Sequence, residues 1–138
     1  MEDCIFCKII AGELPCIKIY EDEQVLAFGD INPVSNGHTL VIPKNHAENL
    51  WKIAPEDLTA VHLCSKKIIQ AMKDALNPSG VACVQLNGSS VNQTVMHYHL
   101  HLIPRAVDGP RLPLGPWKMQ TGNIESIKDT VDKIIAAL

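Results

Sequence analysis

The sequence lacks an excess of basic charge, a long apolar segment and an internal repeat. Its 12 Lys and Arg residues are outnumbered by 15 Asp and Glu residues, and the net charge at pH 7 is −3. This balance provides no basic field for a nucleic-acid polymer or an anionic membrane, but it leaves room for a single nucleotide. The apolar runs are short, and the first residues, MEDC, lack the basic and apolar regions of a signal peptide. We therefore expect a cytoplasmic protein.

The chain also lacks the even number of cysteines that is typical of a disulfide framework, because it has five. In a chain without an export signal, an odd count favours reduced thiols or metal ligands over a disulfide framework. The 138 residues are enough for one domain with its own core, so we expect a single domain over 1–138.

The apolar periodicity predicts an α+β domain with an antiparallel sheet. Pro55, followed by two acidic residues, suits the start of a long helix, and Asn77-Pro78 suits its end near Leu76. A short helix closed by Gly12 and an amphipathic C-terminal helix complete the expected helices. The expected ranges are helices at 4–11, 55–76 and 123–138, and strands at 17–20, 25–28, 38–43, 81–86 and 96–103.

The most informative stretch is MHYHLHLIPR at 96–105, in which His97, His99 and His101 alternate with apolar residues. Alternation predicts a strand with three imidazoles on one face, and its outer two would be about 13 Å apart. One metal could not bind all three, whereas two adjacent rings could share one, as in a metallohydrolase. A His-rich edge strand facing water is the plain alternative. Three imidazoles on one face favour acyl or phosphoryl chemistry, in which a neutral ring attacks and a charged neighbour donates protons.

Residues 97–103 resemble the histidine triad (HIT) superfamily motif His-φ-His-φ-His-φ-φ, where φ is apolar, at every position. Upstream, Asn87-Gly88 and Gln93-Thr94-Val95 resemble the run that precedes the family's triad. Asn92 stands where the family usually has Gly, so we expect a different backbone in that turn. The segments CIFCKII, DINP and GHTLVIPK are similar to the Hint-like branch.

The resemblance implies the HIT fold, which is a five-stranded antiparallel sheet with one long helix, a short N-terminal helix and a C-terminal helix. It places the HIT domain at about 4–112 and a C-terminal helical extension at about 123–138. It also implies a homodimer. It assigns no role to Trp117 or to the 106–122 loop.

The resemblance implies roles for the triad and its surroundings. His99 would be the nucleophile that forms a covalent nucleotidyl-histidine, and His101 would meet the phosphate. The other implied catalytic residues are His97, His38 and Thr94. Donors to the phosphoryl oxygens would be Thr94, the amide of Asn87 and the backbone near Gln93 and Val95. The alternative for His38 is a strand-end histidine bonded to a loop carbonyl.

The nucleoside pocket is implied in the same way. Asp30 would accept hydrogen bonds from both ribose hydroxyls, although an Asp before a Pro-containing loop is also a common turn former. The base would lie between four apolar residues that could equally be core, namely Phe6, Ile9, Phe28 and Ile31.

Cys4 and Cys7 form a CxxC pair that is consistent with a redox pair or with two buried small apolar residues. The Hint-like resemblance adds a third interpretation, a structural zinc site completed by His46 and His97. Catalysis itself would require no cofactor.

We therefore expect an enzyme that cleaves the P–N bond of purine nucleoside 5′-phosphoramidates through a nucleotidyl-histidine. A Fhit-like hydrolase of dinucleoside polyphosphates is the alternative within enzymes, since Gln93-Thr94-Val95 and Ile103-Pro104-Arg105 fit it about as well. A nucleotide-binding or scaffolding protein with incidental turnover is the alternative from another class.

Overall fold

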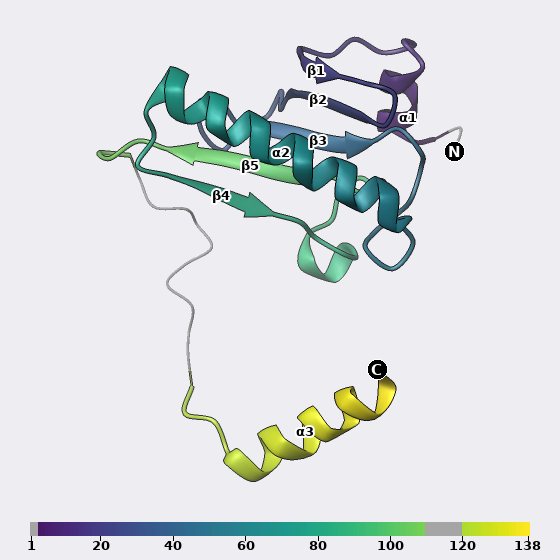
Figure 1. Cartoon of the computed structure of the whole chain (residues 1–138), viewed down its shortest axis with the longest axis vertical. Helices are drawn as coiled ribbons and strands as arrows, with labels where there is room; N and C mark the ends of the chain where they lie inside the picture. Colours follow the sequence, from purple (N-terminus) through teal and green to yellow (C-terminus); the bar gives the residue numbers. More distant parts are fainter. Residues whose placement is uncertain (1–2, 110–119) are drawn as a thin grey trace.

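The computed structural model describes residues 3–109 and 120–138. In this part of the chain, five strands form one antiparallel sheet in the order β1-β2-β3-β5-β4 (Figure 1), which confirms the α+β class. The elements are α1 (Ile5–Ile10), β1 (Lys18–Glu21), β2 (Val25–Gly29), β3 (Thr39–Pro43), α2 (Pro55–Leu76), β4 (Gly80–Val84), a 3-10 turn (Ser89–Val91), β5 (Leu100–Arg105) and α3 (Ile124–Ala137).

The two faces of the sheet pack against different helices because side chains alternate along each strand. On β2, Val25 and Ala27 belong to the core beneath α2, whereas Leu26 and Phe28 belong to a second core that includes Phe6 of α1. The sheet therefore separates a larger core under α2 from a smaller one under α1.

The long helix α2 begins and ends where the sequence predicts. Pro55 opens it, acidic residues occupy its first turn, and Asn77 ends it in the left-handed conformation with φ of 46°. Its buried side chains include Val61, Ile68 and Met72, which pack on the sheet. At about 25 cal/mol per Å² of buried apolar surface, burying each such side chain contributes roughly 1.5 to 3 kcal/mol to the stability of the fold.

Strand β5 lies inside the sheet, between β3 and β4, so the interpretation as a water-facing edge strand is wrong. Leu102 on this strand is fully buried under α2, and His101 pairs with Leu40 on the opposite face, the face of α1. His97 and His99 are also buried. The alternation thus predicts the faces correctly.

The predicted start of this strand at Met96 is wrong, because β5 begins at Leu100. Residues 96–99 make no ladder with β4; instead, the amide of Tyr98 donates to the carbonyl of Ala47 at 2.6 Å. Alternation of side chains reports which face each residue occupies, and it does not report the partner of the backbone. The remaining predicted bounds differ by about two residues or less.

Helix α3 stands apart from the sheet (Figure 1), and none of its residues is buried. Asn123 caps it by accepting a hydrogen bond from the amide of Ser126 at 3.0 Å. Among the described residues, none of the helices is long and apolar enough to cross a membrane. Trp117 and the expected domain boundary near 112 lie outside the described residues.

Candidate active site

A cavity of about 480 Å³ opens on the α1 face of the sheet, beside the histidines. Its walls are mainly apolar and come from α1, the end of β2, the 30–38 loop and the turn before the triad. Ten of the predicted catalytic and nucleotide-binding residues line it: Phe6, Ile9, Phe28, Asp30, Ile31, His38, Thr94, Val95, His99 and His101. A cavity of this size, apolar with a few convergent polar groups, suits a nucleotide.

The hydrogen bonds of His99 fix which of its nitrogens is free. Its Nδ1 lies 2.7 Å from the carbonyl oxygen of His97, and a carbonyl can only accept, so Nδ1 carries the proton. In the neutral ring, Nε2 is then an unprotonated nitrogen with an available lone pair. A nitrogen in this state is able to act as a nucleophile.

His38 and His101 form a second chain of defined protons. The amide of Val34 donates to Nδ1 of His38 at 3.0 Å, so the proton of neutral His38 is on Nε2. That nitrogen lies 2.9 Å from Nδ1 of His101, which must accept. The proton of His101 is consequently on its Nε2, where it can be donated to a phosphoryl oxygen.

Burial keeps these rings neutral. Desolvation lowers the pKa of His101 to about 4; repulsion from His99 or His38, when protonated, lowers this pKa further, and the charge of Asp30 opposes the shift. Desolvation also lowers the pKa of His99 and of His38. Neutral imidazole is the form that attacks an electrophile, so the burial suits nucleophilic catalysis near pH 7.

The two carboxylate oxygens of Asp30 have different contacts. Its Oδ1 accepts from the amide of Asn32 at 2.9 Å, which is the bond of a turn former. Its Oδ2 lies 3.4 Å from Nε2 of His38, on a side chain that lines the cavity. The carboxylate therefore shapes the loop and also faces the site.

Two predicted nucleotide-binding residues, Asn87 and Gln93, do not line the cavity. The amide group of Asn87 is paired with Gln85, and its oxygen also accepts from the amide of Leu50 at 2.8 Å. The buried Gln93 bonds to backbone groups of Gly88, Glu48 and Val95. These side chains brace the turn before the triad. The phosphate contacts that the resemblance implies, from the amide of Asn87 and the backbone near Gln93, stay a prediction.

Asn92 and Cys16 line the cavity although no site role was predicted for them. Asn92 has φ of 71°, in the left-handed region that Gly favours and Asn tolerates, so the difference from the family Gly does not require another backbone path. Cys16 lies alone in its sequence surroundings, and a lone cysteine carries no local pattern that could have revealed its position.

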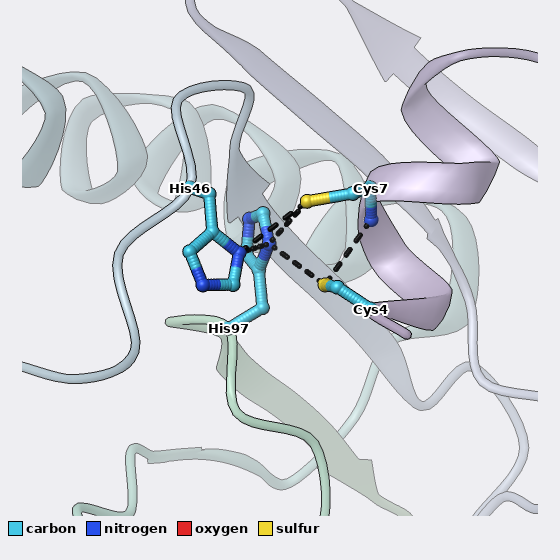
Figure 2. A group of neighbouring side chains, drawn as sticks. All are labelled: Cys4, Cys7, His46 and His97. Carbon is cyan, nitrogen blue, oxygen red and sulfur yellow. Dashed lines mark hydrogen bonds between the residues drawn. The ribbon is translucent and has the colours of Figure 1, made fainter. Parts of the chain in front are cut away.

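The predicted metal ligands form a separate group on the same side of the sheet as α1. Figure 2 shows Cys4, Cys7, His46 and His97 directed toward one another, and their ligand atoms all lie within 4.8 Å of one another. Nδ1 of His97 is 3.4 Å from Sγ of Cys4 and 3.2 Å from Nδ1 of His46. Sγ of Cys7 is 3.3 Å from Nδ1 of His46. Normal zinc bond lengths in a tetrahedron place ligand atoms about 3.3 to 3.8 Å apart, so the donor set fits zinc.

The tautomer of His97 agrees with this interpretation. Its Nε2 donates to the carbonyl of Pro43 at 2.8 Å, which leaves the Nδ1 lone pair facing the thiols. A ligating histidine commonly donates its other N–H to a carbonyl in this way. Desolvation raises the pKa of the Cys7 thiol to about 11, so the thiol is protonated near pH 7 when no metal is bound. A bound cation would have to displace this proton, and its affinity should therefore increase as the pH rises.

Asp30, His38 and His101 form another group with metal-ligand spacing. Nε2 of neutral His38 carries a proton and so has no free lone pair for a metal ion. This group therefore suits hydrogen bonding and proton transfer better than metal binding. No described group of this kind contains two of the triad histidines, so the shared-metal interpretation has no support in the described residues.

The lowered histidine pKa values predict that the protein loses stability in mild acid. The pKa of His101 is about 4 in the folded protein and 6.5 as a free side chain, so between these values the unfolded chain binds more protons. Stability should therefore fall by up to about 1.4 kcal/mol per pH unit for this histidine as the pH drops through that window.

Urea unfolding at several pH values measures this dependence. The slope should be smaller in His101→Gln and unchanged in His62→Gln, since His62 is exposed on α2 outside the cavity. Equal slopes in the wild type and in His101→Gln would contradict the assignment.

Comparisons with known proteins agree with this geometry. The HIT domain family matches residues 11–108. "Protein hit" of Bacillus subtilis is 50% identical over 75% of this chain and 72% of its own length. "Adenosine 5′-monophosphoramidase HNT1" of Saccharomyces cerevisiae is 38% identical over 98% of this chain and 82% of its own. A crystal structure of a HIT family protein from Bacillus anthracis matches with a TM-score of 0.91 and 40% identity over 99% of this chain and 98% of that one. The chain is therefore a hydrolase of the HIT domain family.

Proposed function

We propose that the protein hydrolyses purine nucleoside 5′-phosphoramidates through a nucleotide bound covalently to His99. The observation that carries the proposal is the fixed tautomer of His99, whose unprotonated Nε2 belongs to a ring that lines the cavity. The name of the yeast relative, adenosine 5′-monophosphoramidase, supports the same substrate class.

The reaction divides into two displacements. Nε2 of His99 attacks the α-phosphorus, the P–N bond breaks, and the amine leaves with the electron pair and takes a proton from water. Nε2–H of His101 donates to a phosphoryl oxygen, and the hydroxyl of Thr94 supplies another donor. Water then attacks the phosphorus and loses a proton, the N–P bond breaks, and a nucleoside monophosphate and neutral His99 are released.

The apolar walls of the cavity support binding of the nucleoside. Phe6 and Phe28 stand edge to face with ring centroids 5.6 Å apart, next to Ile9 and Ile31. We place the base among these side chains and the ribose hydroxyls against the carboxylate of Asp30, which lines the same cavity.

A comparison of substrates tests the proposal. Adenosine 5′-phosphoramidate should be hydrolysed with a much larger kcat/KM than diadenosine polyphosphate. Preference for the polyphosphate would favour the Fhit-like alternative. Binding of AMP without turnover of either substrate would favour a nucleotide-binding or scaffolding role.

We also propose a structural zinc ion at Cys4, Cys7, His46 and His97, where it would link α1 to the segment before β5. The purified protein should contain about one zinc per chain and lose it in Cys4→Ser. Because metal binding to a folded site contributes to folding, chelation should lower the melting temperature. Cys83→Ser, on the exposed thiol of β4, is the matched control. A metal-free protein of unchanged stability would contradict the site.

We further propose that the protein forms a homodimer in which α3 contributes to the contact. Six apolar side chains on one side of the C-terminal segment are each at least 43% exposed to solvent. An isolated helix of this length is also only marginally stable in water. The six side chains are Ile124, Ile127, Val131, Ile134, Ile135 and Leu138.

Sedimentation velocity tests this contact. The variant Ile127→Glu with Ile134→Glu should be monomeric, because each buried glutamate would cost several kcal/mol. Lys133→Gln, on the opposite side of α3, should leave the dimer intact. A wild-type protein that sediments as a monomer would contradict the proposal.

A further inference from the structure

His97 belongs to two sites at once. Its side chain contributes Nδ1 to the Cys4–Cys7–His46–His97 cluster (the metal cluster below), and its backbone oxygen accepts the hydrogen bond that fixes the tautomer of His99. Any displacement of His97 therefore moves the acceptor that orients the nucleophile.

The backbone around His97 has little support from the sheet. Residues 96–99 precede β5, and the bond from the amide of Tyr98 to the carbonyl of Ala47 is their backbone link to the neighbouring loop. His97 itself is completely buried and is held through its side chain, by the carbonyl of Pro43 on one side and by the metal cluster on the other. The position of its oxygen thus depends on side-chain contacts.

The same metal cluster is also attached to the helix that forms one wall of the cavity. Cys4 caps α1 and Cys7 lies within it, and between them the ring of Phe6 packs edge to face on His97 and on His99, with centroids 5.9 and 5.2 Å away. Phe6 and Ile9 of this helix line the cavity. A helix of six residues is too short to be stable without such attachments.

We propose that the metal cluster, with a zinc-like cation bound, is the positioning device of the active site, and that His97 is the positioning residue that transmits its effect. Bound metal would hold the carbonyl of His97 against Nδ1 of His99 and would hold α1 against the nucleotide. The kinetic part of this inference rests on the proposed function, whereas the state of His99 and the binding of AMP can be measured without turnover.

The variants His46→Ala and His46→Cys form a matched pair, because His46 is a ligand that lies outside the triad segment and a Cys3His set also binds zinc. In His46→Ala, zinc should be lost, kcat should fall about tenfold to a hundredfold, and AMP should bind more weakly. Nitrogen NMR of His99 should then show a mixture of tautomers. His46→Cys should retain zinc and restore all three properties, and His62→Ala, outside the metal cluster, should leave them unchanged.

Zinc removal from the wild type by a chelator, followed by stepwise return of zinc, repeats the comparison without a mutation. Zinc-free protein with a single Nδ1–H tautomer at His99 and normal affinity for AMP would overturn the proposal. Unfolding of the whole domain on chelation would overturn it as well, because the metal would then serve folding in general. If wild-type protein fails to hydrolyse phosphoramidates, the proposed function fails, and the tautomer and AMP measurements still decide this inference.

Discussion

Replacement of His99 by alanine is expected to reduce kcat/KM for a nucleoside phosphoramidate by at least about a thousandfold, while AMP still binds. The loss should be this large because, in the proposed mechanism, Nε2 of His99 forms the new bond to phosphorus, and water would have to replace it. The residues that we propose for ribose and base binding, Asp30, Phe6 and Phe28, lie elsewhere in the cavity, so binding should be affected much less than turnover.

His99 is buried, and an alanine there leaves an empty space, so a second variant separates chemistry from packing. His99→Gln retains much of the volume and offers an amide that can still donate to the carbonyl of His97. Both variants should be inactive, and His62→Ala, which changes an exposed histidine that contacts Tyr98 on the other side of the sheet, should be fully active.

The intermediate is checked with the wild type. Rapid acid-free quenching followed by mass spectrometry should reveal a nucleotide attached to the triad peptide through an acid-labile bond. Near-normal turnover in His99→Gln, or a nucleotide attached to a different residue, would contradict the assignment of the nucleophile.

The triad shows what alternation along a chain can reveal. It placed His101 and Leu102 on opposite faces correctly, because side chains alternate wherever the backbone is extended. It could not show that His97 and His99 precede the strand. In that segment the His97 side chain and the Tyr98 amide bond to the carbonyls of Pro43 and Ala47, which lie about fifty residues away in the sequence.

The metal cluster and the turn before the triad mark the limits of sequence reasoning more clearly. Cys4 and His97 are separated by 93 positions, so no local spacing could pair them, and only the family resemblance brought them together. Conversely, the resemblance implied a phosphate contact for the side-chain amide of Asn87, which in the structure is engaged in bracing the turn. The amphipathic pattern predicted α3 as a helix, but a pattern within one segment does not show what that segment contacts.

Asp30→Asn is expected to reduce kcat/KM for ribonucleotide substrates by roughly tenfold to a hundredfold or more. The variant retains an oxygen that can accept from the amide of Asn32, so the loop is preserved. It removes the charge from the carboxylate that would accept both ribose hydroxyls, and hydrogen bonds to a charged group contribute about 1.5 to 3 kcal/mol each. By the rule that about 1.4 kcal/mol corresponds to tenfold, a loss of this size follows.

Substrates that lack both ribose hydroxyls test whether this carboxylate binds the ribose. They make no such contact, so wild type and Asp30→Asn should hydrolyse them at similar rates if Asp30 binds the ribose. Asp30 also lies 3.4 Å from Nε2 of His38, whose own Nε2–H lies 2.9 Å from His101. If the carboxylate acts mainly through this histidine chain, or only shapes the loop, the variant should lose activity equally on both kinds of substrate. Measuring kcat/KM for the two proteins on the two substrates therefore decides the role, and equal losses would remove Asp30 from the ribose site.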